Sequence, residues 1–383
     1  MTDTAQPELP QPEIPQAHDP QRRQELLKQH KSYKDVGTYA FVIAVVLLLV
    51  ISTREVPYLQ TSPGPVFNTI GEVDGVKMVE VSGAKTYPTA GELNLMTVRE
   101  RGGPFGELSL PEAFFGWINP IDDVVPSDIF YPEGTTGQEA QERNAIQFDT
   151  SQAAASAAAM KQLGYKVTET VAVANVLDDS PAGGILKDGD VLVRVAGTKV
   201  TSPQQTVKLV QAQKPGTTIE IDIVRDGKPM TVKPKLVASP VDPKKGYLGI
   251  QSMDHYEGPV DVEFGVEGVG GPSAGMMFAL AIIDKLVPEQ LNNGKVVSGT
   301  GTINSDGEVG PVGGVKQKLD AARTKGSEIF LVAKANCEDV IGNEPESMPV
   351  VPVETLSEAL DVLSKWRSGD KNLPRCEATS ESS

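Results

Sequence analysis

One serine, Ser273, stands in a setting that suits either chemistry or helix capping. It lies in the sequence Gly-Pro-Ser-Ala-Gly at 271–275, and the uncharged apolar run 276–283 follows. This run predicts a buried helix with Pro272 in its first turn, where a missing N–H costs nothing. Ser273 would then lie among free N–H groups at the positive end of the helix dipole. Such a serine is either a helix cap or a nucleophile beside an oxyanion hole.

A nucleophilic serine needs a base that takes its proton. Of the histidines His18, His30 and His255, only His255 lies beyond the apolar segment near the N-terminus. The polar stretch 254–258 around it predicts a surface loop with nothing to bury or orient the ring. A lysine can serve instead, where burial lowers its pKa toward neutrality.

Two lysines near the start of a second expected helix, Lys316 and Lys318, compete for this role. Lys318 shares one helical face with Val315 and Ala322, at spacings of three and four residues. Lys316 points roughly the other way, toward solvent. We therefore favour Lys318 as the base; the alternative is a lysine that lies along an apolar face and extends its charge to water.

Composition excludes several other functions. The net charge of -16 argues against nucleic acid as the main partner, because phosphate binding needs clustered Lys and Arg. No phosphate-binding loop for ATP is present in the sequence. Cys337 and Cys376 form no CxxC pair, so we expect no metal site and no cofactor. Whether these two cysteines form a disulfide is left open by their spacing.

The segment 36–52 predicts a membrane-spanning helix, because residues 39–51 carry no charge. Basic residues precede it and only Arg54 follows closely, so the N-terminus should be cytoplasmic and the rest extracytoplasmic. A cleaved signal peptide is the alternative, but the segment lies far from Met1 and lacks a small-x-small cleavage site. We expect a single-pass protein of the cell membrane whose lipid contact is this segment. The preceding basic residues are Arg22, Arg23, Lys28, Lys31 and Lys34.

The middle of the chain, 173–236, predicts a small module made mostly of strands. Residues 218–224 alternate polar and apolar, and Asp226-Gly227 is a hairpin turn. The segment resembles a PDZ domain, which implies capture of extended peptides by strand addition, with the carboxylate-binding loop near 164–171. The alternative is a structural spacer. The resemblance rests on 179–183, 187–192, 195–197, 214–216 and 224–228.

Two further motifs resemble those of the Lon-type serine protease family (S16), which uses a Ser–Lys dyad. They are Gly-Pro-Ser-Ala-Gly at 271–275, and Thr300-Gly301 followed by 311–318. The resemblance implies that Ser273 is the nucleophile, Lys318 the base and Thr300 the residue that orients the lysine. Backbone N–H groups of Ser273 and Ala274 are the candidates for the oxyanion hole.

The resemblance extends more weakly upstream, to 91–95 and a helix at 150–163, so the PDZ module would be inserted within the protease domain. The chain departs from the family in lacking an ATPase module and a histidine-bearing strand, and in having Gly270 where an acidic residue often stands. We expect an α+β protein with a single N-terminal transmembrane helix, a Lon-type α/β proteolytic domain and an inserted, β-barrel-like PDZ domain. The expected parts are a disordered cytoplasmic tail at 1–35, the transmembrane helix at 36–52, protease at 53–165, PDZ at 166–240, protease with the dyad at 241–366, and a disordered tail at 367–383.

The resemblance is greatest to membrane-anchored, PDZ-containing Lon-like proteins of Gram-positive bacteria. It implies an ATP-independent serine endopeptidase that cleaves flexible or unfolded envelope proteins with help from the PDZ domain. The partners would be protein or peptide substrates and the bilayer, and the family resemblance implies a homo-oligomer. The alternative is a catalytically weak PDZ scaffold of the cell envelope.

Overall fold

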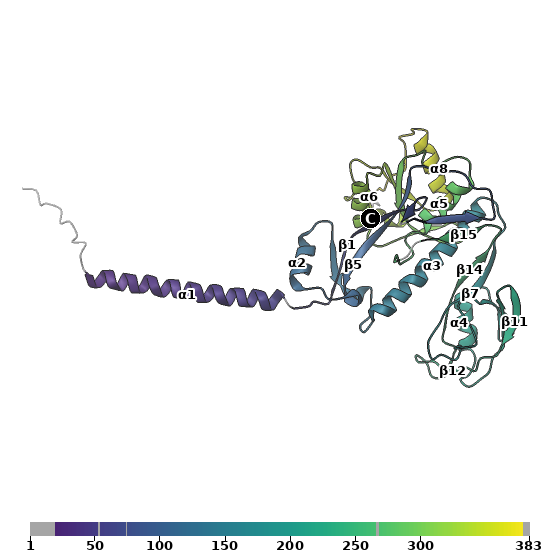
Figure 1. Cartoon of the computed structure of the whole chain (residues 1–383), viewed down its shortest axis with the longest axis horizontal. Helices are drawn as coiled ribbons and strands as arrows, with labels where there is room; N and C mark the ends of the chain where they lie inside the picture. Colours follow the sequence, from purple (N-terminus) through teal and green to yellow (C-terminus); the bar gives the residue numbers. More distant parts are fainter. Residues whose placement is uncertain (1–19, 53, 74, 266–267, 378–383) are drawn as a thin grey trace, which may run out of the picture.

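A long helix leads into a body built on two β-sheets (Figure 1). The computed structural model describes residues 20–377 apart from 53, 74 and 266–267. Its helices are α1 (Pro20–Ser52), α2 (Leu110–Ile118), α3 (Gly137–Gln162), α4 (Pro203–Gln211), α5 (Gly275–Leu286), α6 (Val315–Lys325), α7 (Cys337–Val340) and α8 (Leu356–Arg367), with 3₁₀ turns η1 (Gly103–Phe105), η2 (Ser127–Ile129) and η3 (Lys334–Asn336).

The first sheet combines strands from before and after the middle module. Its order is β20 (Val350–Val353), β19 (Ile329–Ala333), β16 (Val296–Thr300), β5 (Glu92–Gly102), β1 (Tyr58–Asn68) and β6 (Asp123–Pro126). The central strand β5 runs antiparallel to β1 and parallel to β16, which places Asn94 opposite Ser298. The two distant parts of the chain therefore form one hydrogen-bonded unit.

Helix α5 lies at the centre of this unit's core. The run 276–283 is apolar on every side, and a helix of that kind is stable only when it is surrounded. Accordingly, each of these residues is at most 2% exposed. Helix α5 packs against α3, β5 and β16. The predicted buried helix is thus present at the predicted place.

The second sheet belongs to the middle module and has its own apolar core. Its order is β11 (Lys228–Val232), β10 (Ile221–Arg225), β8 (Val191–Val195), β7 (Thr168–Val176) and β14 (Ile250–Glu257), with β9 (Thr198–Lys199) paired to β8. The hairpin turn expected at Asp226-Gly227 joins β10 and β11, and both residues have positive φ. The module lies on the side of the body away from α1 (Figure 1).

Short strands complete the two units. They are β2 (Glu72–Val73), β3 (Val76–Lys77), β4 (Val79–Ser82), β12 (Val237–Ala238), β13 (Gly246–Tyr247), β15 (Asp261–Phe264), β17 (Thr302–Ile303) and β18 (Val309–Gly310). Strand β15 pairs with β4 and follows β14 closely in sequence. The chain therefore leaves the middle module through β14 and returns at once to the first unit.

The surface loop expected around His255 is wrong. His255 lies in the middle of β14, opposite Thr170 of β7, and its backbone carbonyl accepts a hydrogen bond from the Thr170 hydroxyl. The polar residues of 250–256 are half-buried along an edge strand, which needs no apolar alternation on its outer side. The carboxylate-binding loop expected near 164–171 does not include residues 168–171, because these residues belong to strand β7.

The disorder expected throughout 1–35 is also wrong from Pro20 onward, where α1 begins. Residues 21–35 are rich in Gln, Arg, Glu, Leu and Lys, which are strong helix formers. The earlier part of that tail lies outside the described residues. Within the described part of the chain, no helix combines the length and hydropathy required to cross a bilayer.

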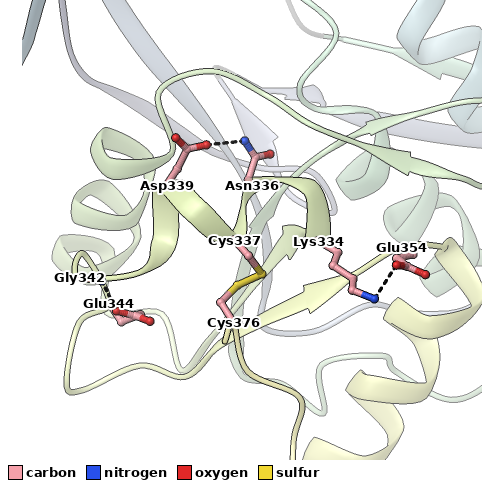
Figure 2. The surroundings of a disulfide bond; sticks show 8 residues. All are labelled: Lys334, Asn336, Cys337, Asp339, Gly342, Glu344, Glu354 and Cys376. Atoms are coloured by element: carbon pink, nitrogen blue, oxygen red, sulfur yellow. Dashed lines mark hydrogen bonds and ion pairs between the residues drawn. A yellow bond between two sulfur atoms is a disulfide. The ribbon is translucent and has the colours of Figure 1, made fainter. Parts of the chain in front are cut away.

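The disordered tail expected at 367–383 does not hold for residues up to 377. Arg367 ends α8 and donates a hydrogen bond to the Gln290 carbonyl oxygen, and Leu373 packs against the core. Cys376 forms a disulfide with Cys337, at a Cα–Cα distance of 5.1 Å (Figure 2). The polar composition of this segment does not reveal that a disulfide attaches it to the folded unit. Residues 378–383 lie outside the described part of the chain.

Candidate active site

Ser273 lies in the turn directly before α5, and it does not cap the helix. The N-cap position belongs to Ala274, and α5 has no side-chain cap. Pro272, expected in the first helical turn, instead precedes the helix and is exposed. The Ser273 side chain is half-buried and its hydroxyl is not used as a cap, which removes the capping alternative.

Helix α3 holds the segment that precedes Ser273. The Gly271 N–H donates to the Asn144 carbonyl oxygen (2.9 Å), and the Ser151 hydroxyl donates to that of Pro272 (3.0 Å). Gly270 lies so close that a Cβ added there would be 2.8 Å from the Asn144 Cβ. The glycine found in place of an acidic residue is therefore the residue that allows α3 to approach.

The end of β16 holds the other side of the serine turn. The Ser273 carbonyl oxygen accepts hydrogen bonds from the Gly301 N–H (3.1 Å) and the Thr300 hydroxyl (3.2 Å). The Met276 N–H in turn donates to the Gly301 carbonyl oxygen (3.2 Å). The turn is thus fixed between α3 and β16, which is the rigidity a preorganised site needs.

Lys318 is buried beside this turn. It is 2% exposed, and its Nζ donates to the Thr300 Oγ1 at 3.2 Å. Burial lowers the pKa of Lys318 from 10.5 to about 7, because the charged form loses its hydration. Thr300 therefore lies between the lysine amine and the backbone of Ser273.

The start of α6 determines where Lys318 points. The N-cap residue Gly314 has a left-handed φ of 67°, and a Cβ there would lie 2.5 Å from the Val98 Cγ1. Only glycine satisfies both demands. Lys316 projects from another face and forms an ion pair with Asp123 (2.9 Å), which Gln317 also contacts. The structure thus separates the two lysines as the helical-face argument predicted.

A groove of about 200 Å³ opens beside Ser273. One wall is β5 from Leu95 to Arg99, and the other is the glycine-rich segment 268–271. The register of β5 with β16 ends at Leu95, so beyond that residue β5 pairs only with β1 among the described strands. Its free backbone edge is suited to an extended chain.

The N–H groups of Ser273 and Ala274 are placed to serve this groove. Within the described chain no acceptor is bonded to either group. Ser273 and Ala274 also line the groove, at the positive end of α5. The arrangement can place a nucleophile, a neutral amine and N–H donors around one carbonyl group.

His255 has no part in this geometry. His255 lies on β14 in the second sheet, where it pairs with Thr170 of β7. Within the described residues, no group of three or more His, Cys, Asp or Glu side chains could hold a metal ion. The sequence did not indicate Asn144, Ser151 or the β5 edge, because their roles arise only from tertiary packing.

Family models match two segments of the chain. Residues 241–365 match the Lon protease (S16) C-terminal proteolytic domain, and residues 146–236 match the PDZ domain. The PDZ match begins within α3. Strand β14 pairs with β7 in the second sheet, the sheet of the PDZ domain, but lies within the residues that match the protease domain. The boundary between the two matches therefore does not coincide with the boundary between the two folded units.

Archaeal Lon proteases are among the similar proteins. That of Halobacterium salinarum is 38% identical over 103 residues, which are 26% of this chain and 14% of the relative. That of Pyrococcus abyssi is 36% identical over 120 residues, which are 31% of this chain and 12% of the relative. The chain thus spans only a small part of the curated relatives that it matches.

Solved structures of PDZ domains are also among the similar proteins. The PDZ domain of an SdrC-like protein from Listeria monocytogenes has 28% sequence identity and a TM-score of 0.20, covering 21% of this chain and 85% of that one. By the two family matches and the named relatives, this chain joins a PDZ domain to a proteolytic domain of the Lon (S16) serine peptidase family.

Proposed function

We propose that the chain is an ATP-independent, membrane-anchored serine endopeptidase with a Ser273–Lys318 dyad. The observation that carries the proposal is a buried lysine with a pKa near 7, joined through Thr300 to the turn that holds Ser273. An ordinary lysine would be almost fully protonated at neutral pH and could not accept a proton. With its pKa lowered to about 7, Lys318 can be neutral near neutral pH and can accept a proton.

In the proposed reaction, neutral Lys318 takes the proton of the Ser273 hydroxyl as Oγ attacks the scissile carbonyl carbon. The N–H groups of Ser273 and Ala274 stabilise the oxyanion of the tetrahedral intermediate. The lysine ammonium then gives its proton to the leaving amine, and the C–N bond breaks. Water hydrolyses the acyl-enzyme by the same steps, while Thr300 keeps the lysine amine in place.

The substrates we propose are flexible or unfolded protein segments. The groove beside Ser273 offers a strand edge, which only an extended chain can use. The sequence contains no ATP-binding loop that could drive unfolding. In the PDZ domain, β14 is one of the two outer strands of its sheet and the one that contacts α4, so an assisting peptide would add there.

For the location, we propose a single-pass anchor at 36–52 with the cytoplasm on its N-terminal side. The support is the uncharged run 39–51 and the basic residues that precede it. The Cys337–Cys376 disulfide agrees with an oxidising, extracytoplasmic location for the protease and PDZ domains. The family resemblance further supports a homo-oligomer.

Hydrolysis of casein by the full chain in detergent tests the proposal. Ser273→Ala and Lys318→Ala should each lower the rate at least about a thousandfold, whereas Lys316→Ala should retain most of it. A serine-directed phosphonate probe should label the wild type but not Ser273→Ala. Equal casein hydrolysis by wild type and Ser273→Ala would refute the dyad. Absence of both labelling and hydrolysis in the wild type would favour the PDZ scaffold.

A further inference from the structure

Helix α2 turns its large apolar side chains toward solvent. Phe115, Trp117 and Ile118 are 64%, 70% and 60% exposed, and Leu110 and Phe114 are also exposed. Leu110, Phe114, Trp117 and Ile118 follow the helical spacing of a single face. A surface helix normally turns such a face to the core. We call these five residues the α2 apolar face.

The inward side of α2 explains this reversal. Gly116 is its buried residue, and a Cβ there would lie 2.7 Å from the Val124 Cγ2 of β6. The helix therefore packs closely on β6 through a residue without a side chain. Among the described residues of α2, no large apolar side chain lies on the side that faces β6. The outward aromatic side chains are therefore not needed to fill the core at this place.

The position of α2 relative to α1 indicates what the α2 apolar face would meet. Helix α1 ends at Ser52, and the Leu110 N–H donates to the Arg54 carbonyl oxygen (3.0 Å). The Val56 N–H donates to the Leu108 carbonyl oxygen (2.9 Å), and α1 contacts α2. Figure 1 shows α2 where α1 joins the body. The start of α2 is thus tied to the end of the apolar segment.

We infer that the α2 apolar face docks into the headgroup region of the bilayer beside α1. This inference rests on the proposed anchor at 36–52. If that segment spans the membrane, its last residue lies at the outer interface, and the bonds of Arg54 and Val56 hold α2 at the same level. Trp and Phe are enriched at that level, because their rings are stable between hydrocarbon and water. The face therefore fits a lipid surface.

The two tryptophans provide a test in the full chain. Trp117 lies on the α2 apolar face, whereas Trp366 of α8 packs against the core and lies beside Lys295. The chain is reconstituted into phosphatidylcholine–phosphatidylglycerol vesicles whose acyl chains are brominated near the headgroup. Brominated lipid should quench the Trp117 component about twofold. The matched variant Trp117→Phe should lose this quenching, and Trp366→Phe should keep it.

Flotation on a density gradient separates the anchor from the docking. A chain that floats while Trp117 remains unquenched retains the anchor and overturns the docking. A second copy of the chain could instead cover the α2 apolar face. In that case Trp117 emission would be shielded from water, would depend on protein concentration and would be insensitive to brominated lipid. This result would also overturn the inference. A chain that does not float overturns both proposals, since neither α1 nor α2 then binds lipid.

Discussion

Lys318 has an environment that suits a base and opposes stability. The residue is 2% exposed, and its amine has a single hydrogen-bond partner among the described residues, the Thr300 hydroxyl. Without a carboxylate beside it, burial alone lowers the pKa to about 7. The same burial disfavours the protonated form in the folded state, so the site has a free-energy cost.

The pH dependence of kcat/KM should therefore report the titration of Lys318. Only the neutral amine can accept the serine proton, so kcat/KM should fall about tenfold per pH unit below pH 7 and level off above it. The measurement is hydrolysis of a fluorogenic peptide between pH 5 and pH 9. A profile that keeps rising up to pH 9 would show that the lysine is not the base with this pKa.

Lys318→Met should stabilise the fold while removing activity. In the unfolded chain the lysine binds its proton below pH 10.5, and in the folded protein it does so only below about pH 7. Unfolding thus takes up a proton between these values, and the stability of the wild type relative to the variant rises with pH there. At pH 7 the variant should gain roughly 4 kcal/mol. Urea unfolding at pH 7 and pH 9.5 measures this, and a gain that does not shrink at pH 9.5 would contradict it.

At the scale of elements, helix α3 positions the turn that carries Ser273, although it contributes no group to the proposed dyad. It supplies the Asn144 carbonyl and the Ser151 hydroxyl to the segment before Ser273. The same helix continues to Lys161, which forms ion pairs with Glu169 of β7 and Asp306 (2.6 and 2.8 Å). One helix therefore contacts the serine turn, the PDZ sheet and the β17–β18 turn.

Gly270→Ala tests the close approach of α3. The added Cβ would lie 2.8 Å from the Asn144 Cβ, so the serine turn must move away from the helix. We expect the free energy of unfolding to fall by about 1 to 3 kcal/mol and kcat to fall more than KM rises. Asn144→Gly removes the opposing Cβ and provides the matched control.

Activity should recover partly in the double variant, beyond the sum of the single effects. Thermal unfolding and peptide hydrolysis of the four proteins complete the cycle. Additive losses would show that the two positions do not meet in the working enzyme.

Elements whose own residues follow a clear hydrophobic pattern could be predicted from the sequence. Elements that depend on contacts with residues far away in the sequence could not. The run 276–283 predicted α5 because a wholly apolar helix has one stable environment. The helical face of Lys318 likewise follows from spacing alone. The strand that carries His255 is polar on both faces, so its existence depends on pairing with β7. The start of α5 after Ser273 depends on bonds to α3 and β16, which no local pattern contains.

At the scale of the whole molecule, the disulfide links the last described residues to the first unit (Figure 2). Cys337 and Cys376 are separated by 39 residues, which include β20 and α8. Cys376→Ser should destabilise this unit by up to about 4 kcal/mol, the loop-closure entropy of such a link. Thermal unfolding of wild type and variant, each with and without reductant, measures the effect. A wild type that reductant does not affect would contradict it.

The pairing of β5 with β16 bears on the order in which the protein becomes active. Asn94 lies opposite Ser298, and the whole PDZ domain is synthesised between these strands. Lys318 follows later still. A ribosome must therefore release β5, the middle module, β16 and α6 before Ser273, Thr300 and Lys318 can meet. A nascent chain that stops short of Lys318 would hold the proposed nucleophile without its proposed base, so under the proposed mechanism this topology would delay proteolysis until α6 has been synthesised.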